Sequence, residues 1–557
     1  MAYDHRKYRP FPQIQRPQRR WPDRAITQAP SWCAVDLRDG NQALVRPMSV
    51  LQKRRLFQLL VEVGVKEIEV GFPSASQPDF DFVRAILEEG MVPDDVTVQV
   101  LTQARKELIE RTFESLKGAK RAVVHLYNST STVQRDYVFQ LPREGIRAIA
   151  EQGARWIKEC AAKYPETEWW FEYSPESFTG TELDFAAEVV NAVIDVWRPD
   201  QGQHVIINLP STVEMSTPNV YADMIEWMND NIKYRDKIRL SVHTHNDRGC
   251  GVAAAELSVM AGADRVEGTL LGNGERTGNM DMVTMAMNLY SQGVDPKLDL
   301  SNMRRIIETV EFCTEIETHP RHPYAGELVY TAFSGSHQDA IRKSLAKQTA
   351  EQAWHVAYLP IDPEDLGRRY EEVIRINSQS GKGGVLYVLE RDFGITLPRW
   401  LQIAFSKVVQ TEAERTGNEI EGAGVRELFD ASYVKSADDL HLGDYQVTRV
   451  GDRVRVQASV SGRPVQGEGN GVVDAFMQGI GTSHGVTAVV EAFDEFALTQ
   501  GAAAAAMACV RLGLGGQAVI GVAFAEDTTG AALQAVLNAL ARTRALTGGA
   551  SSSIAAE

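Results

Sequence analysis

The sequence is poor in cysteine and has no long apolar run. Its five cysteines are odd in number and form no Cys-x-x-Cys pair, so we expect reduced thiols in a cytoplasmic protein. No run of about 18 apolar residues is present, which argues against a membrane span. Residues 1–30 are rich in Arg, Gln and Pro and lack the apolar core of a signal peptide, so we expect a surface arm there.

A net positive charge is also lacking. The chain has 58 basic and 74 acidic side chains, which gives a formal net charge of −16. This balance argues against nucleic acid or an anionic membrane as the main partner, and an anionic substrate would need local positive groups. The 557 residues suffice for about three domains, or for one barrel with appended segments.

Strand-like and helix-like runs alternate between residues 30 and 290. Such alternation indicates parallel strands joined by right-handed crossovers, and eight units in about 260 residues is the size of a (β/α)8 TIM barrel. The expected strands are Trp32–Asp36, Glu67–Gly71, Val96–Leu101, Ala122–Leu126, Trp169–Tyr173, His204–Leu209, Ile238–His243 and Asp264–Leu270. An open doubly wound sheet is the alternative, but it usually has fewer strands and a Gly-rich phosphate turn after the first strand, which is absent here.

Polar groups follow the expected strands, where a barrel carries its active groups. The candidates are Arg38, Asp39, His125, Glu172, Glu176, Asn208, Thr212, His243, His245 and the segment Gly272–Asn279. Histidines and acids that end apolar strands are costly to bury without partners. We therefore expect these groups to converge on one barrel mouth, although polar loops place some of them there by chance.

Two histidines two positions apart end the seventh strand. Residues i and i+2 of a strand point to the same face, so His243 and His245 can bind one ion. Together with the carboxylate of Asp39, beside Arg38, they suit a divalent metal that keeps open coordination positions. From the spacing alone, a solvated or packed pair is the plainer interpretation.

Two glycine-rich segments are candidates for ligand contacts. Gly272–Asn279 lacks the Lys-Ser/Thr ending of a P-loop. Its glycines allow a tight loop that returns Asn279 to the metal as an oxygen ligand, and an ordinary βα turn is the alternative. Ser380–Gly384 either contacts phosphate or simply breaks a helix.

The pattern changes after residue 300. Residues 301–427 are mainly helical, and a strands-then-helix pattern then occurs twice, which indicates a pseudo-twofold α+β domain. Its first round is Tyr445–Val450, Arg453–Val460 and the glycine-rich segment Gly467–Gly471, which leads into Val472–Gln478. Its second is Val486–Glu495, an Ala-rich helical stretch, Ala518–Phe524 and Thr528–Ala541. The expected segments are an arm (1–30), the barrel (31–325), helical linker subdomains (326–437), the α+β domain (438–545) and a disordered tail (546–557).

Three motifs together closely resemble the 2-isopropylmalate synthase family. They are Asp36–Gln42 (DLRDGNQ), His243–Gly249 (HTHNDRG) and Glu267–Asn279 (EGTLLGNGERTGN). The arm from Tyr8 onward and the segments Phe333–Asp339, Tyr358–Arg368 and Ile376–Gly384 resemble the long form of this enzyme. The family belongs to the barrel metalloenzymes that make or break carbon–carbon bonds beside acyl-CoA carbonyls.

The resemblance implies a Claisen-type condensation of acetyl-CoA with 3-methyl-2-oxobutanoate. Hydrolysis of the thioester then gives 2-isopropylmalate and CoA, in the first committed step of leucine biosynthesis. A divalent ion (Zn, Mg or Mn) is implied on Asp39, His243, His245 and Asn279, and a monovalent cation is an additional candidate cofactor. The implied assembly is a homodimer inhibited by leucine.

The resemblance also implies roles for other side chains. Arg38 would stabilise the developing alkoxide, and His125 and Thr212 would bind substrate. Glu176 and His337 would act in proton transfer, His337 from the partner subunit, with Tyr370 in support. From the residues alone, plainer interpretations stay open for four of them: a solvated loop acid (Glu176), a helix-cap neighbour (His337), a satisfied core histidine (His125) and a packing residue (Tyr370).

The C-terminal domain resembles the leucine-binding regulatory module of the family. Gly469, Asn470 and Gly471 precede a helix whose N-terminus can bind a carboxylate, and Ala475 and Phe493 are candidates to surround an isobutyl group. A hairpin turn in a dimerisation domain is the plainer alternative. For the whole chain, the competing hypotheses are a sister synthase that uses 2-oxoglutarate or pyruvate, and a leucine-sensing protein with an inert barrel.

Overall fold

The computed structural model describes residues 4–332, 334–368, 382–416, 420, 422–435, 440–497 and 505–548. The chain divides into two compact units. The first comprises Met1–Tyr330 and Pro360–Tyr370, and the second comprises Thr331–Leu359 and Glu371–Glu557.

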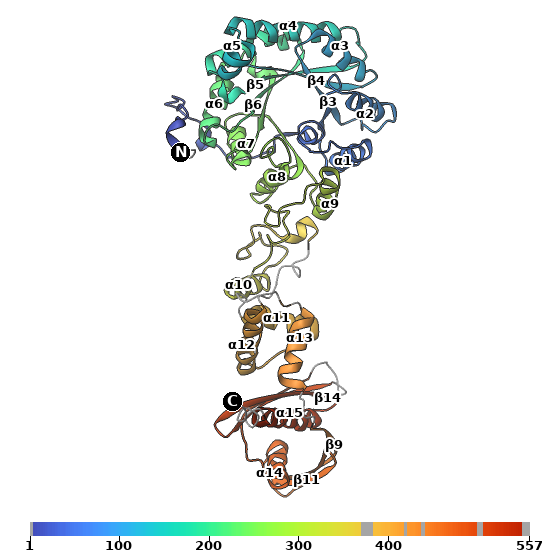
Figure 1. The fold of residues 1–557 in the computed structure, drawn as a ribbon, viewed down its shortest axis with the longest axis vertical. Helices are drawn as coiled ribbons and strands as arrows, with labels where there is room; N and C mark the ends of the chain where they lie inside the picture. The colour runs from blue at the N-terminus through green and yellow to red at the C-terminus, as the bar shows by residue number, and fades with distance from the viewer. Residues whose placement is uncertain are drawn as a thin grey trace, which may run out of the picture. The chain divides into compact units, whose positions relative to one another are not determined.

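The first unit contains a closed barrel of eight parallel strands, which confirms the predicted fold (Figure 1). The barrel closes where β8 pairs with β1, with Ser31 opposite Arg265 and Ala34 opposite Gly268. The strands are β1 (Ser31–Ala34), β2 (Glu67–Gly71), β3 (Thr97–Gln103), β4 (Arg121–Ser129), β5 (Glu168–Glu176), β6 (His204–Ser211), β7 (Ile238–Thr244) and β8 (Arg265–Gly268).

Helices surround the barrel on its outside (Figure 1). They are α1 (Val50–Val63), α2 (Gln77–Glu88), α3 (Lys106–Ser115), α4 (Arg143–Ala161), α5 (Leu183–Trp197), α6 (Pro218–Asn231), α7 (Gly251–Met260) and α8 (Met282–Tyr290). Local sequence sets the ends of α1, because Ser49 and Gln52 form a capping box and Gly64 ends the helix with φ at 102°. After the barrel come α9 (Met303–Thr314) and a 3-10 turn at Pro363–Leu366.

Strand β8 is shorter than predicted. The sequence favours a strand over Asp264–Leu270, but Leu270–Gly272 form a 3-10 turn in which Leu271 has φ at 59°. At Gly268 a Cβ atom would lie 2.5 Å from the carbonyl oxygen of Met280. The close approach of the returning chain therefore ends the strand early.

The N-terminal arm is bound to α6 by ion pairs. Arg19 Nε lies 2.7 Å from Asp223 Oδ1, and Arg16 Nε lies 3.0 Å from Glu226 Oε2. Trp21 also donates its Nε1–H to Asp223 Oδ1 over 2.9 Å. Because both acidic side chains of α6 are fully buried, the arm satisfies charges that would otherwise lie unpaired.

The second unit begins with helices and ends in an α+β domain that confirms the predicted two-round pattern (Figure 1). The helices are α10 (Gly335–Leu345), α11 (Lys382–Phe393), α12 (Arg399–Thr416) and α13 (Gly422–Phe429). The first round is β9 (Leu442–Val450), β10 (Arg453–Val460), β11 (Arg463–Gly469) and α14 (Val472–His484); the second is β12 (Val489–Ala497), β13 (Ala506–Leu514), β14 (Gln517–Ala525) and α15 (Thr528–Gly548). Each round forms one antiparallel three-stranded sheet.

One detail of this domain was predicted wrongly. The Ala-rich stretch was expected to be helical, but in its described part Ala506–Leu514 form β13. This strand pairs with β12 and β14, and its alternate residues contact two different cores, so tertiary packing outweighs the helix propensity of alanine. The glycine-rich segment Gly467–Gly471 begins within strand β11, which runs to Gly469, and leads into α14 as expected.

The glycines of β11 allow a helix to pack closely on the sheet. A Cβ atom at Gly467 would lie 2.2 Å from the carbonyl oxygen of Ala475 in α14. In the second round, a Cβ atom at Gly521 would lie 2.2 Å from the carbonyl oxygen of Ala535 in α15. The two rounds therefore use equivalent glycines for the same purpose, in keeping with the predicted pseudo-twofold relation.

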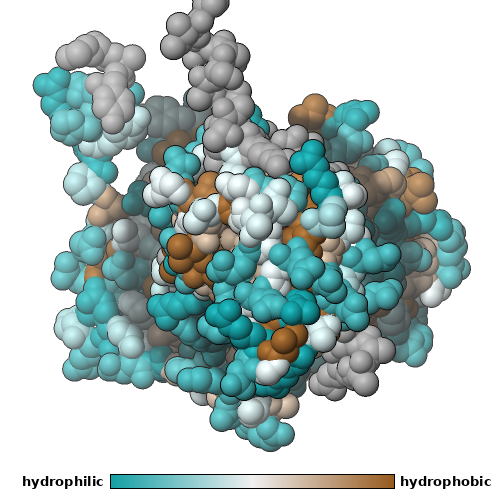
Figure 2. All heavy atoms as spheres, turned by 90° about the horizontal axis from the view of Figure 1, so that it is seen from below, coloured by the Kyte–Doolittle hydropathy of each residue, from teal (hydrophilic) through white to brown (hydrophobic). Residues whose placement is uncertain are grey.

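The outer surface of this domain is mainly polar. Strand β9 is largely exposed along its length. Seen from the end that carries α14 and β11, hydrophilic side chains dominate and apolar ones are scattered (Figure 2). Among the described helices of the whole chain, none combines the length and apolar character that crossing a bilayer requires.

Candidate active site

Three side chains meet at the carboxyl end of the barrel. The Nε2 atoms of His243 and His245 lie 3.2 Å apart, and each lies close to Asp39 Oδ2, at 3.5 and 3.6 Å respectively. A cation about 2.1 Å from each of its ligands would space neighbouring ligands about 3.0–3.4 Å apart. The three atoms therefore have the spacing of ligands that share one cation.

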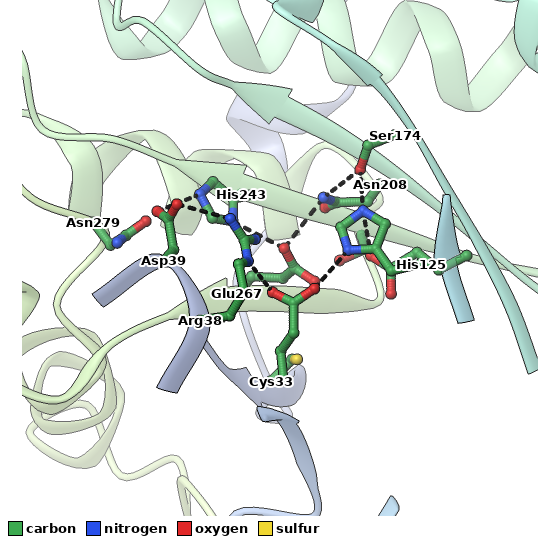
Figure 3. A network of polar contacts seen from close by, with 12 residues as sticks. Cys33, Arg38, Asp39, His125, Ser174, Asn208, His243, Glu267 and Asn279 are labelled. Atoms are coloured by element: carbon green, nitrogen blue, oxygen red, sulfur yellow. Dashed lines mark hydrogen bonds and ion pairs between the residues drawn. The ribbon is translucent and has the colours of Figure 1, made fainter. Parts of the chain in front are cut away.

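Different elements bring these groups together. His243 belongs to β7, His245 follows it, and Asp39 lies in the helical turn Asp36–Gly40 after β1. An isolated antiparallel bridge pairs His245 with Asn279. The glycine-rich segment after β8 therefore does return Asn279 to the histidines, beside Asp39 (Figure 3).

The buried polar atoms of this cluster fit a divalent cation. Asp39 Oδ2 and Asn279 Oδ1 are buried and have no hydrogen-bond partner among the described residues. The amide orientation of Asn279 is fixed, because its Nδ2 donates to the carbonyl oxygen of Asn273 over 3.1 Å. Buried oxygens without partners are costly, and a cation bound among them would remove that cost.

The surroundings favour an ionised carboxylate at this position. Burial opposes ionisation of Asp39, yet the Arg38 guanidinium and the two imidazoles hold the pKa of its carboxyl well below its usual range. Burial also disfavours charge on His243, but Asp39 and Glu267 raise its pKa to about 9. Burial and the neighbouring His243 lower the pKa of His245 to about 4.

Glu267 orients the first histidine from beneath the cluster. Its Oε2 lies 2.8 Å from His243 Nδ1 (Figure 3). With a cation bound in place of the second proton, this contact would keep the proton of His243 on Nδ1 and leave Nε2 as the ligand atom. The other carboxylate oxygen accepts from Arg265 Nη1 over 2.9 Å, and this fully buried guanidinium also contacts Glu67 and Glu172.

A second chain of contacts positions Arg38. Its Nη1 donates to Asp39 Oδ1 over 2.7 Å, and its Nε donates to Glu69 Oε2 over 2.6 Å. Glu69 Oε1 lies 2.8 Å from His125 Nδ1, and His125 Nε2 lies 2.7 Å from Ser174 Oγ (Figure 3). Asp39 and Glu69 thus hold the Arg38 guanidinium, and Glu69 and Ser174 hold the His125 imidazole.

A cavity of about 310 Å³ opens above these groups. The predicted site residues that line it are Arg38, Asp39, His125, Glu176, Thr212, His243 and His245. Glu176 accepts a hydrogen bond from Ser129 Oγ, and Thr212 Oγ1 accepts the backbone N–H of Ser177 over 2.9 Å. Phe72, Leu101 and Pro210 supply apolar wall.

His337 and Tyr370 are the remaining predicted catalytic residues. His337 lies on α10 in the second unit, where it is exposed and stacks on Tyr358 with ring centroids 3.9 Å apart. Tyr370 lies outside the described residues, as do the first two residues of the predicted loop Ser380–Gly384.

The predicted effector residues lie in the C-terminal domain. Gly469, Asn470 and Gly471 run from the end of β11 to the start of α14, and Ala475 is buried in the first turns of that helix. Phe493 on β12 is partly buried against the same core. The backbone N–H of Asn470 donates to Asp474 Oδ2 over 2.8 Å, so an acidic side chain already interacts with this helix N-terminus.

Several polar contacts of the site were missed from the sequence. Glu69 had a signal, because Glu67 and Glu69 are acidic residues two apart in an otherwise apolar strand. Glu267 belongs to the motif Glu267–Asn279, but the sequence indicated no role for its side chain. Ser174 had no signal of its own, because its role depends on the register that places it near His125.

Comparisons with known proteins divide the chain into three matches. Residues 29–310 match the HMGL-like family. Residues 327–390 match the alpha-isopropylmalate synthase post-catalytic domain-like family. Residues 419–544 match the LeuA allosteric (dimerisation) domain.

Curated relatives match almost the full length. The chain is 60% identical to a 2-isopropylmalate synthase of Alcanivorax borkumensis over 547 residues, covering 97% of this chain and 98% of that protein. It is 54% identical to the 2-isopropylmalate synthase of a Parafrankia species, covering 96% and 97% of the two chains. The chain therefore belongs to the 2-isopropylmalate synthase family of acyltransferases.

Proposed function

We propose that this enzyme condenses acetyl-CoA with 3-methyl-2-oxobutanoate and hydrolyses the thioester to 2-isopropylmalate and CoA. The observation that carries the proposal is the cluster of Asp39, His243 and His245 beneath a cavity at the barrel mouth. Near-identical length and 60% identity to a 2-isopropylmalate synthase support the choice of reaction.

The proposed cation site consists of Asp39, His243, His245 and Asn279. When bound there, a divalent cation polarises the keto group of a 2-oxo acid and makes its carbon electrophilic. Two imidazole nitrogens and two oxygens do not separate Zn, Mg and Mn. Glu267 keeps Nε2 of His243 free of its proton in this arrangement.

Arg38, His125 and Thr212 are proposed to hold the 2-oxo acid. The Arg38 guanidinium is fixed by two carboxylates, so it can stabilise the alkoxide that develops on the keto oxygen without reorganising. The hydroxyl of Thr212 accepts a backbone N–H and therefore keeps its own proton for a substrate carboxylate.

The acetyl methyl group is a very weak acid and needs a positioned base. Glu176 is the proposed base from the cavity wall, because its Ser129 contact fixes the carboxylate at the end of β5. His337 is proposed to act in the same proton transfer from the partner subunit of a homodimer, with Tyr370 in support. The match of residues 419–544 to a dimerisation domain supports a dimer.

Leucine is the proposed inhibitor, bound near Gly469–Gly471 with Ala475 and Phe493 around its side chain. The match to a LeuA allosteric domain supports this assignment. Because Asp474 already accepts the N–H of Asn470, the leucine carboxylate would have to compete with that side chain. Weak inhibition would follow if Asp474 were hard to displace.

A thiol-release assay tests the proposal. The purified enzyme should release CoA from acetyl-CoA with 3-methyl-2-oxobutanoate faster than with 2-oxoglutarate or pyruvate. A chelator should stop the reaction and a divalent cation should restore it. Faster turnover of another 2-oxo acid would identify a sister synthase, and leucine binding without any turnover would identify an inert barrel.

A further inference from the structure

Arg276 links three loops at the barrel mouth. Its guanidinium donates to both carboxylate oxygens of Asp247 in the loop after β7, over 2.7 Å from Nε and 3.1 Å from Nη2. The same Nη2 donates to the carbonyl oxygen of Thr212 in the loop after β6. Arg276 itself lies in the segment after β8 and lines the cavity, so one side chain joins the three loops.

The backbone at Arg276 adopts a conformation that favours glycine. Arg276 has φ at 55°, in the left-handed region that favours glycine. The side chain is about two-fifths exposed, so burial does not hold the residue there. Because Lys297 shares this backbone conformation, it is the contacts with Asp247 and Thr212 that indicate a role for the Arg276 guanidinium.

The Thr212 loop is held from two sides. Thr212 Oγ1 accepts the N–H of Ser177, and Thr179 Oγ1 donates to the carbonyl oxygen of Val213 over 2.9 Å. Both of these contacts come from the segment after β5. From the β7 side, Asp247 Oδ2 accepts the N–H of Glu214 over 3.0 Å, and Glu214 Oε2 accepts the backbone N–H of Arg248. The Arg276 guanidinium contacts the Thr212 carbonyl oxygen directly and also holds the Asp247 carboxylate that binds this loop.

We propose that Arg276 is a positioning residue that holds Thr212 in place to bind the carboxylate of the 2-oxo acid. This role rests on the proposed function, because Thr212 is the residue through which it acts. A guanidinium clamps an anionic carboxylate and a carbonyl oxygen at once, in a fork geometry that lysine lacks. Loss of the clamp would loosen the substrate contact while leaving the reacting groups near Asp39 in place.

The kinetic test compares Arg276→Gln with the matched control Lys297→Gln. Lys297 is also a basic residue at positive φ, 59°, that pairs with an acid, Asp295, but it lies in the loop between α8 and α9. Arg276→Gln should raise the KM for 3-methyl-2-oxobutanoate by about 10- to 100-fold, with kcat and the KM for acetyl-CoA changed by less than about threefold. Lys297→Gln should match the wild type, and Arg276→Lys should recover part of the loss.

A double variant tests whether Arg276 acts through Thr212. If it does, Arg276→Gln added to Thr212→Val should cost no more than Thr212→Val alone. Fully multiplicative losses, or an unchanged KM in Arg276→Gln, would overturn the proposal.

Hydrogen exchange separates this role from the proposed reaction, since it needs no substrate. Arg276→Gln should speed amide exchange at residues 211–217, whereas Lys297→Gln should not. Exchange equal to that of the wild type would refute the clamp. If the wild type released no thiol with any 2-oxo acid but exchange still rose at 211–217, the proposed function would fail and the clamp would stand.

Discussion

Replacing Glu267 by glutamine changes the cation site without altering an atom that would bind the cation. All four neighbours of this carboxylate are donors: His243 and Asn208 contact Oε2 at 2.8 and 3.2 Å, and Arg265 and Gln99 contact Oε1 at 2.9 and 3.2 Å. Glutamine offers one acceptor and one donor in the same space. One pair of neighbours must therefore face an NH2 group.

Both orientations of the amide have a cost. If the NH2 group faces Arg265, a buried guanidinium loses a carboxylate and gains a donor opposite it. If it faces His243, the imidazole can accept only by moving its proton to Nε2, the atom that would bind the cation. Loss of such an outer contact lowers metal affinity about 10- to 100-fold, equivalent to about 1.4–2.7 kcal/mol.

The assay is a competition titration with a chromophoric chelator, using Mn²⁺ or Zn²⁺ as the probe. Glu67→Gln is the matched control, because Glu67 also pairs with Arg265, through Nε at 2.7 Å, but has no contact with His243. Glu267→Gln should weaken cation binding while Glu67→Gln should not, and turnover should return as the cation concentration is raised. Equal affinities in the two variants would refute the argument.

Four further outcomes are expected. Asp39→Ala or His245→Ala should abolish thiol release with the circular dichroism spectrum unchanged; full activity would exclude either residue as a ligand. Burial raises the pKa of Asp36 to about 8. Between about pH 4 and pH 8 this carboxyl is therefore protonated in the folded state and ionised in the unfolded chain. The free energy of unfolding falls as the pH rises through that range. Asp36→Asn should remove about 2.6 kcal/mol of that fall between pH 5 and 7, and an unchanged pH dependence in urea unfolding would contradict this. Gly521→Ala should destabilise the C-terminal domain by about 3 kcal/mol, because its Cβ would lie 2.2 Å from a carbonyl oxygen of α15; a wild-type melting temperature would refute the close packing. Asn470→Asp should weaken leucine inhibition more than catalysis, and unchanged inhibition curves would remove this residue from the effector site.

Much of the barrel was predictable because its signals are local. Each strand is a short apolar run, and the capping box and final glycine of helix α1 mark its ends in the sequence. The meeting of His243 with Asp39 followed from a general property of barrels, which gather residues at the carboxyl ends of their strands. The sequence predicted that Asp39 lies near the two histidines and that Asn279 returns to them. It could not give the distances between these side chains.

What could not be predicted depends on contacts between distant segments. The Ala-rich segment has strong helix propensity, and only pairing with two neighbours makes it strand β13. Gly467 looks like a turn residue until α14 is seen against it. The support of His125 by Glu69 and Ser174 depends on the register of three strands, which periodicity does not fix.

The anchoring of the N-terminal arm bears on how the protein is produced. Trimming the first two dozen residues as a dispensable tail would remove the arginines and the tryptophan that face Asp223 and Glu226. Helix α6 would then carry the unpaired carboxylates of Asp223 and Glu226 on the surface that the arm covers. A shortened chain should therefore express poorly, or its stability should depend on the salt concentration. An affinity tag should therefore be added before the complete N-terminal arm and should not replace it.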